Sequence, residues 1–244
     1  EAVRVYVGFD DTDNIDSDFG TGKLTRHFEN ELPDGCSLWG VVRQQLLVDD
    51  HIPYTSHNSS ACAIVEVADL SQVDQLIDLA IEHLEQNSAE GSDPGLCVVK
   101  EREPVLNHLA VFGRSCTAKV VTQQDVLKVA NGTHLSGHGG TNDGIIGAAA
   151  AVGLTFSGWS GRFIEFGRLR DFPHKTSVKQ LEDAGIHVIS LDRNAMVPDS
   201  DDTVNTMGWL RPRLWGSRPV LPVLPSGDKV WESMGKKRGK KKDN

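Results

Sequence analysis

The sequence predicts an α+β or α/β protein, because segments with strand character alternate with segments of helical period. Residues 3–9 open the chain as an apolar strand, and residues 61–67 form a second run of this kind. Between residues 70 and 84, apolar side chains recur about every 3.6 positions, which indicates an amphipathic helix. A strand, a helix and another strand, ending at residues 96–99, suit half of a ferredoxin-like unit.

The other elements follow from the same patterns. We expect helices at residues 22–32, 123–130, 145–152 and 178–184. We expect strands at residues 37–48, 119–121, 163–166 and 188–191. From Pro198 onward, prolines and tryptophans interrupt the pattern. This segment is expected to be an extended arm that lies over the body or reaches a partner subunit, which makes a homodimer reasonable.

Composition limits the class of protein. The 244 residues suffice for one large or two modest domains with real cores. No apolar run approaches the length of a membrane span, so we expect no membrane association and a cytoplasmic location. The four cysteines form no Cys-x-x-Cys pair, which favours reduced core thiols over a zinc site or disulfides.

The charge distribution gives a second limit. A formal net charge of −9 argues against a broad nucleic-acid surface. The exception is the basic tail at residues 236–242, which is typical of a solvated chain end but could hold RNA loosely.

Three carboxylates, Asp10, Asp11 and Asp13, follow the first strand directly. Like charges this close repel one another unless a cation lies among them, and Mg²⁺ prefers such oxygen ligands. Thr12 adds a hydroxyl of the kind that joins a Mg²⁺ shell. A plain solvated loop is the alternative, but the position at the carboxyl end of a buried strand favours a ligand site.

A glycine-containing helix start follows the acidic turn. Gly20, Thr21 and Gly22 precede Lys23 and the helical pattern. Free amides and the positive end of a helix dipole attract anions, so these four residues are expected to cradle phosphate. Metal ligands and a phosphate cradle on one edge predict a Mg²⁺-nucleotide site.

A second candidate region spans residues 134–144. Gly139 and Gly140 are favoured as ligand contacts because a helix cap needs no such glycine run. Asn142 and Asp143 are either caps or ligand contacts, and ordinary capping suits Asn142 equally well.

Three further polar residues are weighed for ligand roles. His51 and His57 are interpreted as surface or hydrogen-bonded loop histidines instead of metal ligands. Arg168 either steadies a phosphate or pairs with a nearby Asp.

Two segments resemble a known family. Residues 8–14, Gly-Phe-Asp-Asp-Thr-Asp-Asn, are similar to the Gly-Ile-Asp-Asp-Thr-Asp-Ser signature of the archaeal tRNA-Ile agmatidine synthetase family. Residues 144–153, Gly-Ile-Ile-Gly-Ala-Ala-Ala-Ala-Val-Gly, are similar to its Gly-Val-Ile-Gly-Ala-Leu-Ala-Ala-Ile-Gly segment. Residues 52–55 and 58–61 lie near a third family motif, in the same order.

The resemblance implies an architecture. Residues 1–60 and 130–195 correspond to an atypical kinase-like ATP-binding domain, residues 61–129 to an inserted ferredoxin-like domain, and residues 196–244 to the arm and tail. The family's OB-fold and zinc ribbon, which grip tRNA, are not expected here.

The resemblance also implies a reaction. It implies ATP and Mg²⁺ as cofactors and phosphoryl transfer or ATP hydrolysis, with Asp10, Asp11 and Asp13 as metal-binding and catalytic residues. The acceptor, a small molecule or RNA, is left open. The alternatives are a non-catalytic nucleotide- or polyamine-binding module, and an RNA-modification subunit that uses a separate RNA-binding partner.

Overall fold

The computed structural model describes residues 2–17, 19–52 and 58–234, and it divides into two compact units between Phe166 and Gly167. This boundary differs from the three-part division expected from the sequence. The segment assigned to a separate ferredoxin-like domain contributes strands to the same sheet as the first strand of the chain, and hydrogen bonds between those strands join them into one unit. No helix of the described part is long and apolar enough to cross a membrane.

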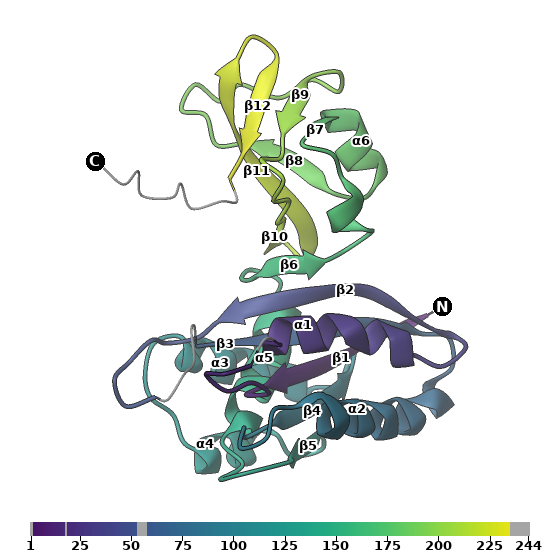
Figure 1. Ribbon diagram of the computed structural model, residues 1–244, viewed down its shortest axis with the longest axis vertical. Helices are drawn as coiled ribbons and strands as arrows, with labels where there is room; N and C mark the ends of the chain where they lie inside the picture. The colour runs from purple at the N-terminus through teal and green to yellow at the C-terminus, as the bar shows by residue number, and fades with distance from the viewer. Residues whose placement is uncertain (1, 18, 53–57, 235–244) are drawn as a thin grey trace. The chain divides into compact units, whose positions relative to one another are not determined.

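The first unit is built on an antiparallel sheet in the order β5-β4-β1-β3-β2-β6 (Figure 1). Its strands are β1 (Val3–Asp10), β2 (Cys36–Gln45), β3 (Ser59–Val67), β4 (Gly95–Lys100), β5 (His134–Gly137) and β6 (Arg162–Glu165). All five neighbouring pairs run antiparallel. The α+β expectation is therefore confirmed for this unit, and a parallel α/β sheet is excluded.

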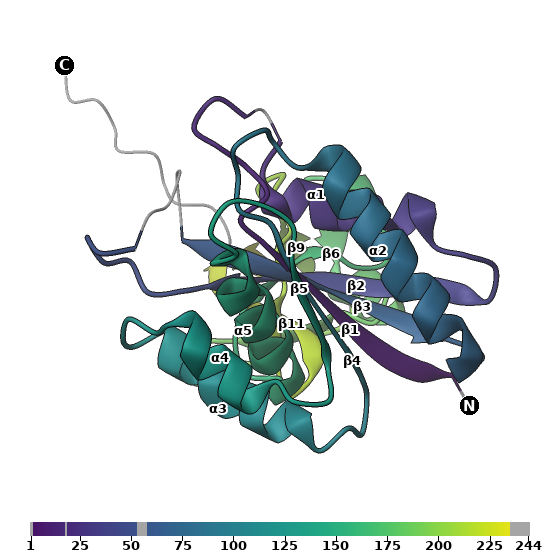
Figure 2. The ribbon, with the colours of Figure 1, turned by 90° about the horizontal axis from the view of Figure 1, so that it is seen from below.

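Helices cover both faces of this sheet, as Figure 2 shows. The helices are α1 (Thr21–His27), α2 (Val73–Asn87), α3 (Val105–Cys116), α4 (Gln123–Val129) and α5 (Gly144–Ser157), with 3-10 turns at Phe28–Glu31 and Leu70–Gln72. Val5, Val7 and Phe9 of β1 join the core under α1 and α2. Tyr6, on the alternate face, meets Phe156 of α5.

Helix α5 lies unusually close to the sheet. A Cβ on Gly8 would overlap the carbonyl oxygen of Ala148, and a Cβ on Gly95 would overlap the backbone of Gly144. Small residues on both elements therefore let the backbones approach, which brings the start of α5 to the end of β1.

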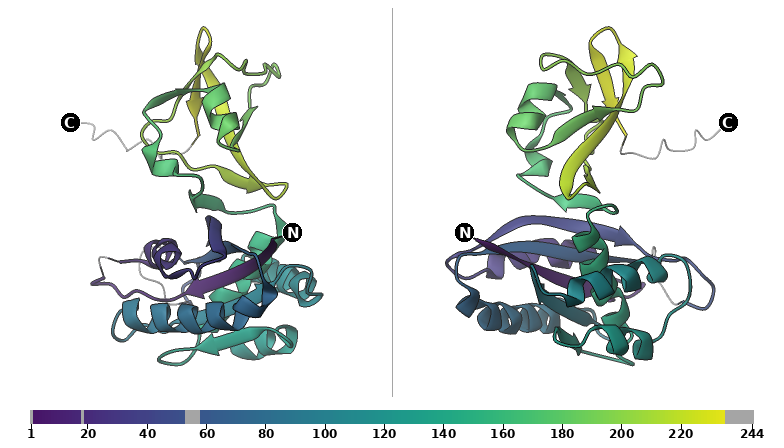
Figure 3. Two further views of the ribbon diagram at one scale, coloured as in Figure 1. Left: turned by 90° about the vertical axis from the view of Figure 1, so that its right-hand side faces the viewer. Right: turned by 180° about the vertical axis from the view of Figure 1, so that it is seen from behind.

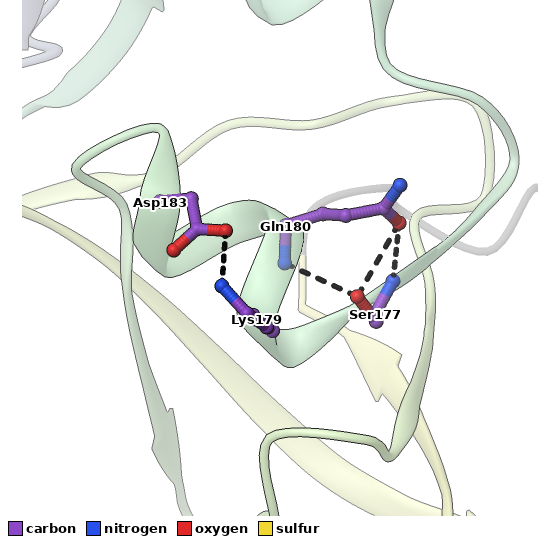
Figure 4. Close-up of polar contacts among 4 residues, drawn as sticks. All are labelled: Ser177, Lys179, Gln180 and Asp183. Carbon is purple, nitrogen blue, oxygen red and sulfur yellow. Dashed lines mark hydrogen bonds and ion pairs between the residues drawn. The ribbon is translucent and has the colours of Figure 1, made fainter.

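The second unit contains a smaller mixed sheet (Figure 3). Its elements are β7 (Lys175–Ser177), α6 (Val178–Asp183), β8 (His187–Ser190), β9 (Thr203–Asn205), β10 (Arg213–Trp215), β11 (Arg218–Gly227) and β12 (Val230–Ser233), with a 3-10 turn at Leu169–Asp171. The strand order is β10-β11-β12-β9-β7, and β8 pairs with β11 in parallel. Figure 4 shows how α6 begins: the Ser177 hydroxyl accepts from the Gln180 amide, and Gln180 Oε1 accepts from the Ser177 amide.

The extended arm expected from Pro198 onward is wrong, because β9 to β12 lie in this sheet. Val220, Leu221 and Val223 of β11 are buried, so the strand supplies core to the second unit. Proline lacks an amide donor but keeps its carbonyl acceptor. Pro222 uses that acceptor for the amide of Met234 at 3.1 Å.

The local expectations in the first unit are confirmed with one exception. The strand expected at residues 119–121 is absent, and these residues form a turn and loop between α3 and α4. Its short apolar run, Val120 and Val121, lines a cavity described below instead of a sheet.

Candidate functional site

The acidic turn lies where β1 ends. Asp10 is the last residue of the strand and lies on the face that α5 covers. Asp11 turns the chain with a φ of 52°, a left-handed conformation that Asp adopts more readily than most residues. Both residues are partly buried. The strand thus brings its terminal carboxylate against a helix instead of into bulk solvent.

The two carboxyl groups hold protons more tightly than usual. Burial raises the pKa of Asp10 to about 8, and the neighbouring charge of Asp11 adds to the effect. Burial also raises the pKa of Asp11 to about 6, followed by the charge of Asp93. A bound cation would favour the ionised form of both groups. The pair is therefore chemically suited to a positively charged ligand.

Thr12 points into the protein. Its side chain is 1% exposed, and its hydroxyl donates to the Thr21 hydroxyl at 3.0 Å. The backbone carbonyl of Thr12 accepts from the amide of Ala89. The threonine expected in a metal shell therefore joins the acidic turn to the first residue of α1.

The helix start at Gly20 has no side-chain cap. Thr21 lines the cavity described below, whereas a Cβ on Gly22 would lie 3.0 Å from Ile164 Cδ1, so Gly22 packs against β6. Lys23 Nζ lies 4.3 Å from the centre of the Phe19 ring. Of the expected phosphate cradle, Thr21 is the residue that the structure brings to the cavity wall.

The glycine-rich loop before α5 surrounds a carboxylate of the protein itself. Asp93 accepts from the amides of Thr141, Asn142 and Asp143 at 3.0, 2.7 and 3.1 Å. A Cβ on Gly139 would lie 2.9 Å from the carbonyl oxygen of Ser92. The glycines expected to contact a ligand thus lie against the segment that precedes β4.

A cavity of about 880 Å³ opens beside the acidic turn. Its described lining residues are Asp10, Asp11, Asp13, Asn14, Ile15, Thr21, Leu46, His51, Ile52, Asn58, Ser59, Cys116, Lys119, Val120, Val121, Thr122, Gln123, Gln124, Asp143, Ile146 and Gly147. The volume lies in the range of small-molecule and cofactor sites. The structure therefore unites the three predicted aspartates with Thr21 and Asp143 around one space.

Asp143 is fixed in the cavity wall by Gln123. Gln123 Nε2 donates to Asp143 Oδ1 at 2.6 Å and to the carbonyl oxygen of Thr141 at 2.7 Å. Asn142, by contrast, has a left-handed φ of 66° and lies against Gly137. Adjacent residues of one loop thus have separate roles, the first in packing and the second at the cavity.

Sequence reasoning missed several residues of this wall. Lys119 is the only Lys or Arg among the described lining residues, and it lies in the loop for which a strand was expected. Cys116 and Gln123 come from the end of α3 and the start of α4. Lys119, Val120 and Gln123 are close in sequence, but no motif marks them. Only the chain path from α3 to α4 brings them beside the acidic turn.

The donors fit a magnesium ion that a nucleotide helps to hold. Among the described residues, no group of three or more His, Cys, Asp or Glu side chains could hold a metal ion alone. Mg²⁺, however, usually takes one or two carboxylates together with substrate phosphates and water. Asp10 and Asp11 meet that smaller requirement.

The remaining expectations lie outside this wall or outside the described residues. His51, exposed on the loop after β2, has its Nδ1 2.6 Å from Asp49 Oδ1, as expected for a hydrogen-bonded loop histidine. Arg168 belongs to the second unit and lies 4.0 Å from Asp171 in an exposed ion pair. His57 and the basic tail lie outside the described residues.

Together these features define an α+β protein whose antiparallel sheet ends at an aspartate-lined cavity of cofactor size. No protein-family model and no curated protein matches the chain. Solved structures do match it. The chain is 28% identical to TiaS, an agmatidine synthetase that acts on an isoleucine tRNA, in its complex with that tRNA and ATP, with a TM-score of 0.53. It is 26% identical, with a TM-score of 0.52, to the TiaS complex with the same tRNA, AMPCPP and agmatine.

A tRNA fluorescent labeling enzyme matches equally well, at 28% identity and a TM-score of 0.53. Each of these three matches covers 62% of this chain and 36% of the other chain. The resemblance that the two motifs predict is therefore confirmed, and the chain spans about a third of the length of the proteins it matches.

Proposed function

We propose that this chain is the nucleotide-using part of an ATP-dependent enzyme that resembles agmatidine synthetase. One observation carries the proposal: Asp10, Asp11, Asp13 and Asp143 converge, beside Thr21, on one cavity large enough for a nucleotide. The similarity to TiaS structures that contain ATP or AMPCPP supports the same ligand class. The proposed reaction is phosphoryl transfer or ATP hydrolysis.

In this proposal, the carboxylates of Asp10 and Asp11, with Asp13 beside them, hold the metal. Mg²⁺, when bound, neutralises phosphate charge at the reacting group. One of the three aspartates orients or deprotonates the acceptor. Asp10, with its raised pKa, is the group best able to take up a proton near neutral pH.

The phosphates would be held by residues of the facing wall. Thr21 offers a hydroxyl and the first amide of α1, and Gly20, Gly22 and Lys23 shape that helix start. Lys119 supplies the positive charge of the lining. Positioning by these groups is expected to contribute most of the rate.

The acceptor remains part of the proposal. The matched TiaS complexes hold an isoleucine tRNA, and one also holds agmatine, so an RNA nucleotide or a small amine is the acceptor class to test first. Gly139, Gly140, Asn142 and Arg168 are proposed as contacts of secondary importance, because none of them is among the residues that line the cavity.

The test is isothermal titration with ATP, with and without Mg²⁺, followed by product analysis of the same sample. Mg²⁺-dependent binding with release of ADP or AMP is expected. Asp10→Asn should abolish turnover and keep the fold, whereas Asp34→Asn, an aspartate outside the cavity lining and near the start of β2, should behave as wild type. Full turnover in Asp10→Asn would refute the metal assignment.

A binding module without catalysis is the second candidate. The observation that favours it is the acidic lining, in which Lys119 is the only Lys or Arg among the described residues, because such a wall also suits a polyamine cation. Incubation with ATP separates the two readings. A module of this kind binds spermidine and releases no ADP or AMP over time.

A further inference from the structure

Asp93 lies in the segment between α2 and β4 and is absent from the described cavity lining, yet its carboxylate accepts several hydrogen bonds. Oδ2 accepts from the Thr141 amide at 3.0 Å, the Thr141 hydroxyl at 2.5 Å and the Asp143 amide at 3.1 Å. Oδ1 accepts from the Asn142 amide at 2.7 Å. Three successive backbone donors therefore converge on one side chain.

The backbone of the same segment binds the acidic turn. The Asp93 amide donates to the carbonyl oxygen of Asp11 at 3.2 Å, and the Ala89 amide donates to that of Thr12 at 2.9 Å. Asn14 Nδ2 donates to the carbonyl oxygen of Glu90 at 3.0 Å. Asp93 thus joins the acidic turn through its amide and the start of α5 through its carboxylate.

The glycine run before α5 provides room for this carboxylate. Gly140 has a φ of 51°, and a Cβ there would lie 3.1 Å from Asp93 Cγ. A side chain at this position would be strained and would also press on the Asp93 carboxyl group. The glycine therefore serves the contact with Asp93.

We propose that Asp93 is the positioning residue of the cavity, fixing Asp11 on one side and Asp143 on the other at the separation that the ligand needs. The inference rests on the proposed function and extends it to a residue outside the cavity lining. Because the loop amides already bind Asp93, nucleotide phosphates are expected at the aspartates, Thr21 and Lys119, not at this loop.

Asp93→Asn tests the role at constant side-chain shape. An amide offers one acceptor oxygen where the carboxylate offers two, so its NH₂ group would face backbone donors and the loop would shift. We expect kcat for ATP turnover to fall about 10- to 100-fold at a temperature where the variant is fully folded. Thr141→Val, which removes only the hydroxyl bond, should lower kcat less, and Asp34→Asn should leave it unchanged.

The readouts separate this inference from the proposed function. A purely structural role would lower Tm but leave kcat of the folded variant intact, and that result would overturn the inference. If wild-type protein neither binds nor turns over ATP, the proposed function fails. Hydrogen exchange then still tests the contact, because the amides of residues 141–143 should exchange faster in Asp93→Asn, and unchanged exchange would refute it.

Discussion

The hydroxyl groups of Thr12 and Thr21 lie 3.0 Å apart in the interior, and their hydrogen bond joins the acidic turn to the first residue of α1. The bond connects two segments that the sequence marks separately. It also holds Thr21 at the cavity wall while Thr12 stays buried. The acidic turn and the helix start therefore form one connected part of the site.

Thr12→Val should destabilise the protein. The isosteric change leaves the Thr21 hydroxyl without its buried partner, which costs about 1–3 kcal/mol of unfolding free energy. Urea unfolding measures the change. Thr117→Val, which removes an exposed hydroxyl bonded to the Arg114 carbonyl, is the matched control and should cost less. Equal losses would show that the buried bond has no special weight.

Gly147→Ala should impair the site more than the fold of α5. An added Cβ would overlap the Asp10 carboxyl group, so that side chain must move. We expect Mg²⁺-ATP affinity to fall about tenfold or more, measured by titration, since the metal ligands lose their geometry. Ser157→Ala, in the last turn of the same helix, should keep wild-type affinity. Tight binding by Gly147→Ala would mean that Asp10 does not contact the ligand.

Stability without divalent cations should fall as pH rises from about 4 to 8. Burial raises the pKa of Asp10 to about 8 from an ordinary value of 3.8, so the folded state binds the proton that the unfolded state has released. Because the folded state binds more protons in this window, rising pH favours unfolding. Thermal melts at several pH values measure the trend. Asp10→Asn should reduce the slope, and an unchanged slope would contradict the assignment.

Lys119→Gln should weaken nucleotide binding. The change removes the only Lys or Arg among the described lining residues, and a charged hydrogen bond contributes about 1.5–3 kcal/mol, or roughly tenfold or more in Kd. Titration with Mg²⁺-ATP measures it, and Lys119→Arg should retain part of the affinity. The loss should shrink with added salt. An unchanged Kd would place the phosphates elsewhere.

The second unit should respond to pH in the opposite direction. Trp231 Nε1 donates to Asp202 Oδ2 at 2.8 Å, and this bond holds the pKa of Asp202 below its ordinary value. Its contribution is present above the ordinary pKa and is lost as pH falls through the lowered one. Trp231→Phe should therefore cost stability at neutral pH and less in acid. Trp209→Phe, at an exposed tryptophan, is the control, and an equal cost at both pH values would contradict this account.

Most elements of the first unit were predictable, because their signals are local. The alternation of Val5, Val7 and Phe9 predicts a strand with one buried face, and the structure places that face under α1 and α2. The helical period near residues 70–84 likewise predicts α2. In the second unit, the prolines of β11 gave the wrong expectation, since the partners that fix a strand are distant in sequence.

The sequence by itself determined that three aspartates follow a buried strand and that small residues line a later helix, because both are patterns within a few neighbouring positions. Only the tertiary structure decided what those patterns do. Close packing of α5 on β1 places Gly147 beside Asp10, and the loop before α5 closes on Asp93. The path from α3 to α4 adds Lys119 to the cavity. Such contacts depend on how distant segments pack, and a local pattern contains no information about a partner that lies far away along the chain.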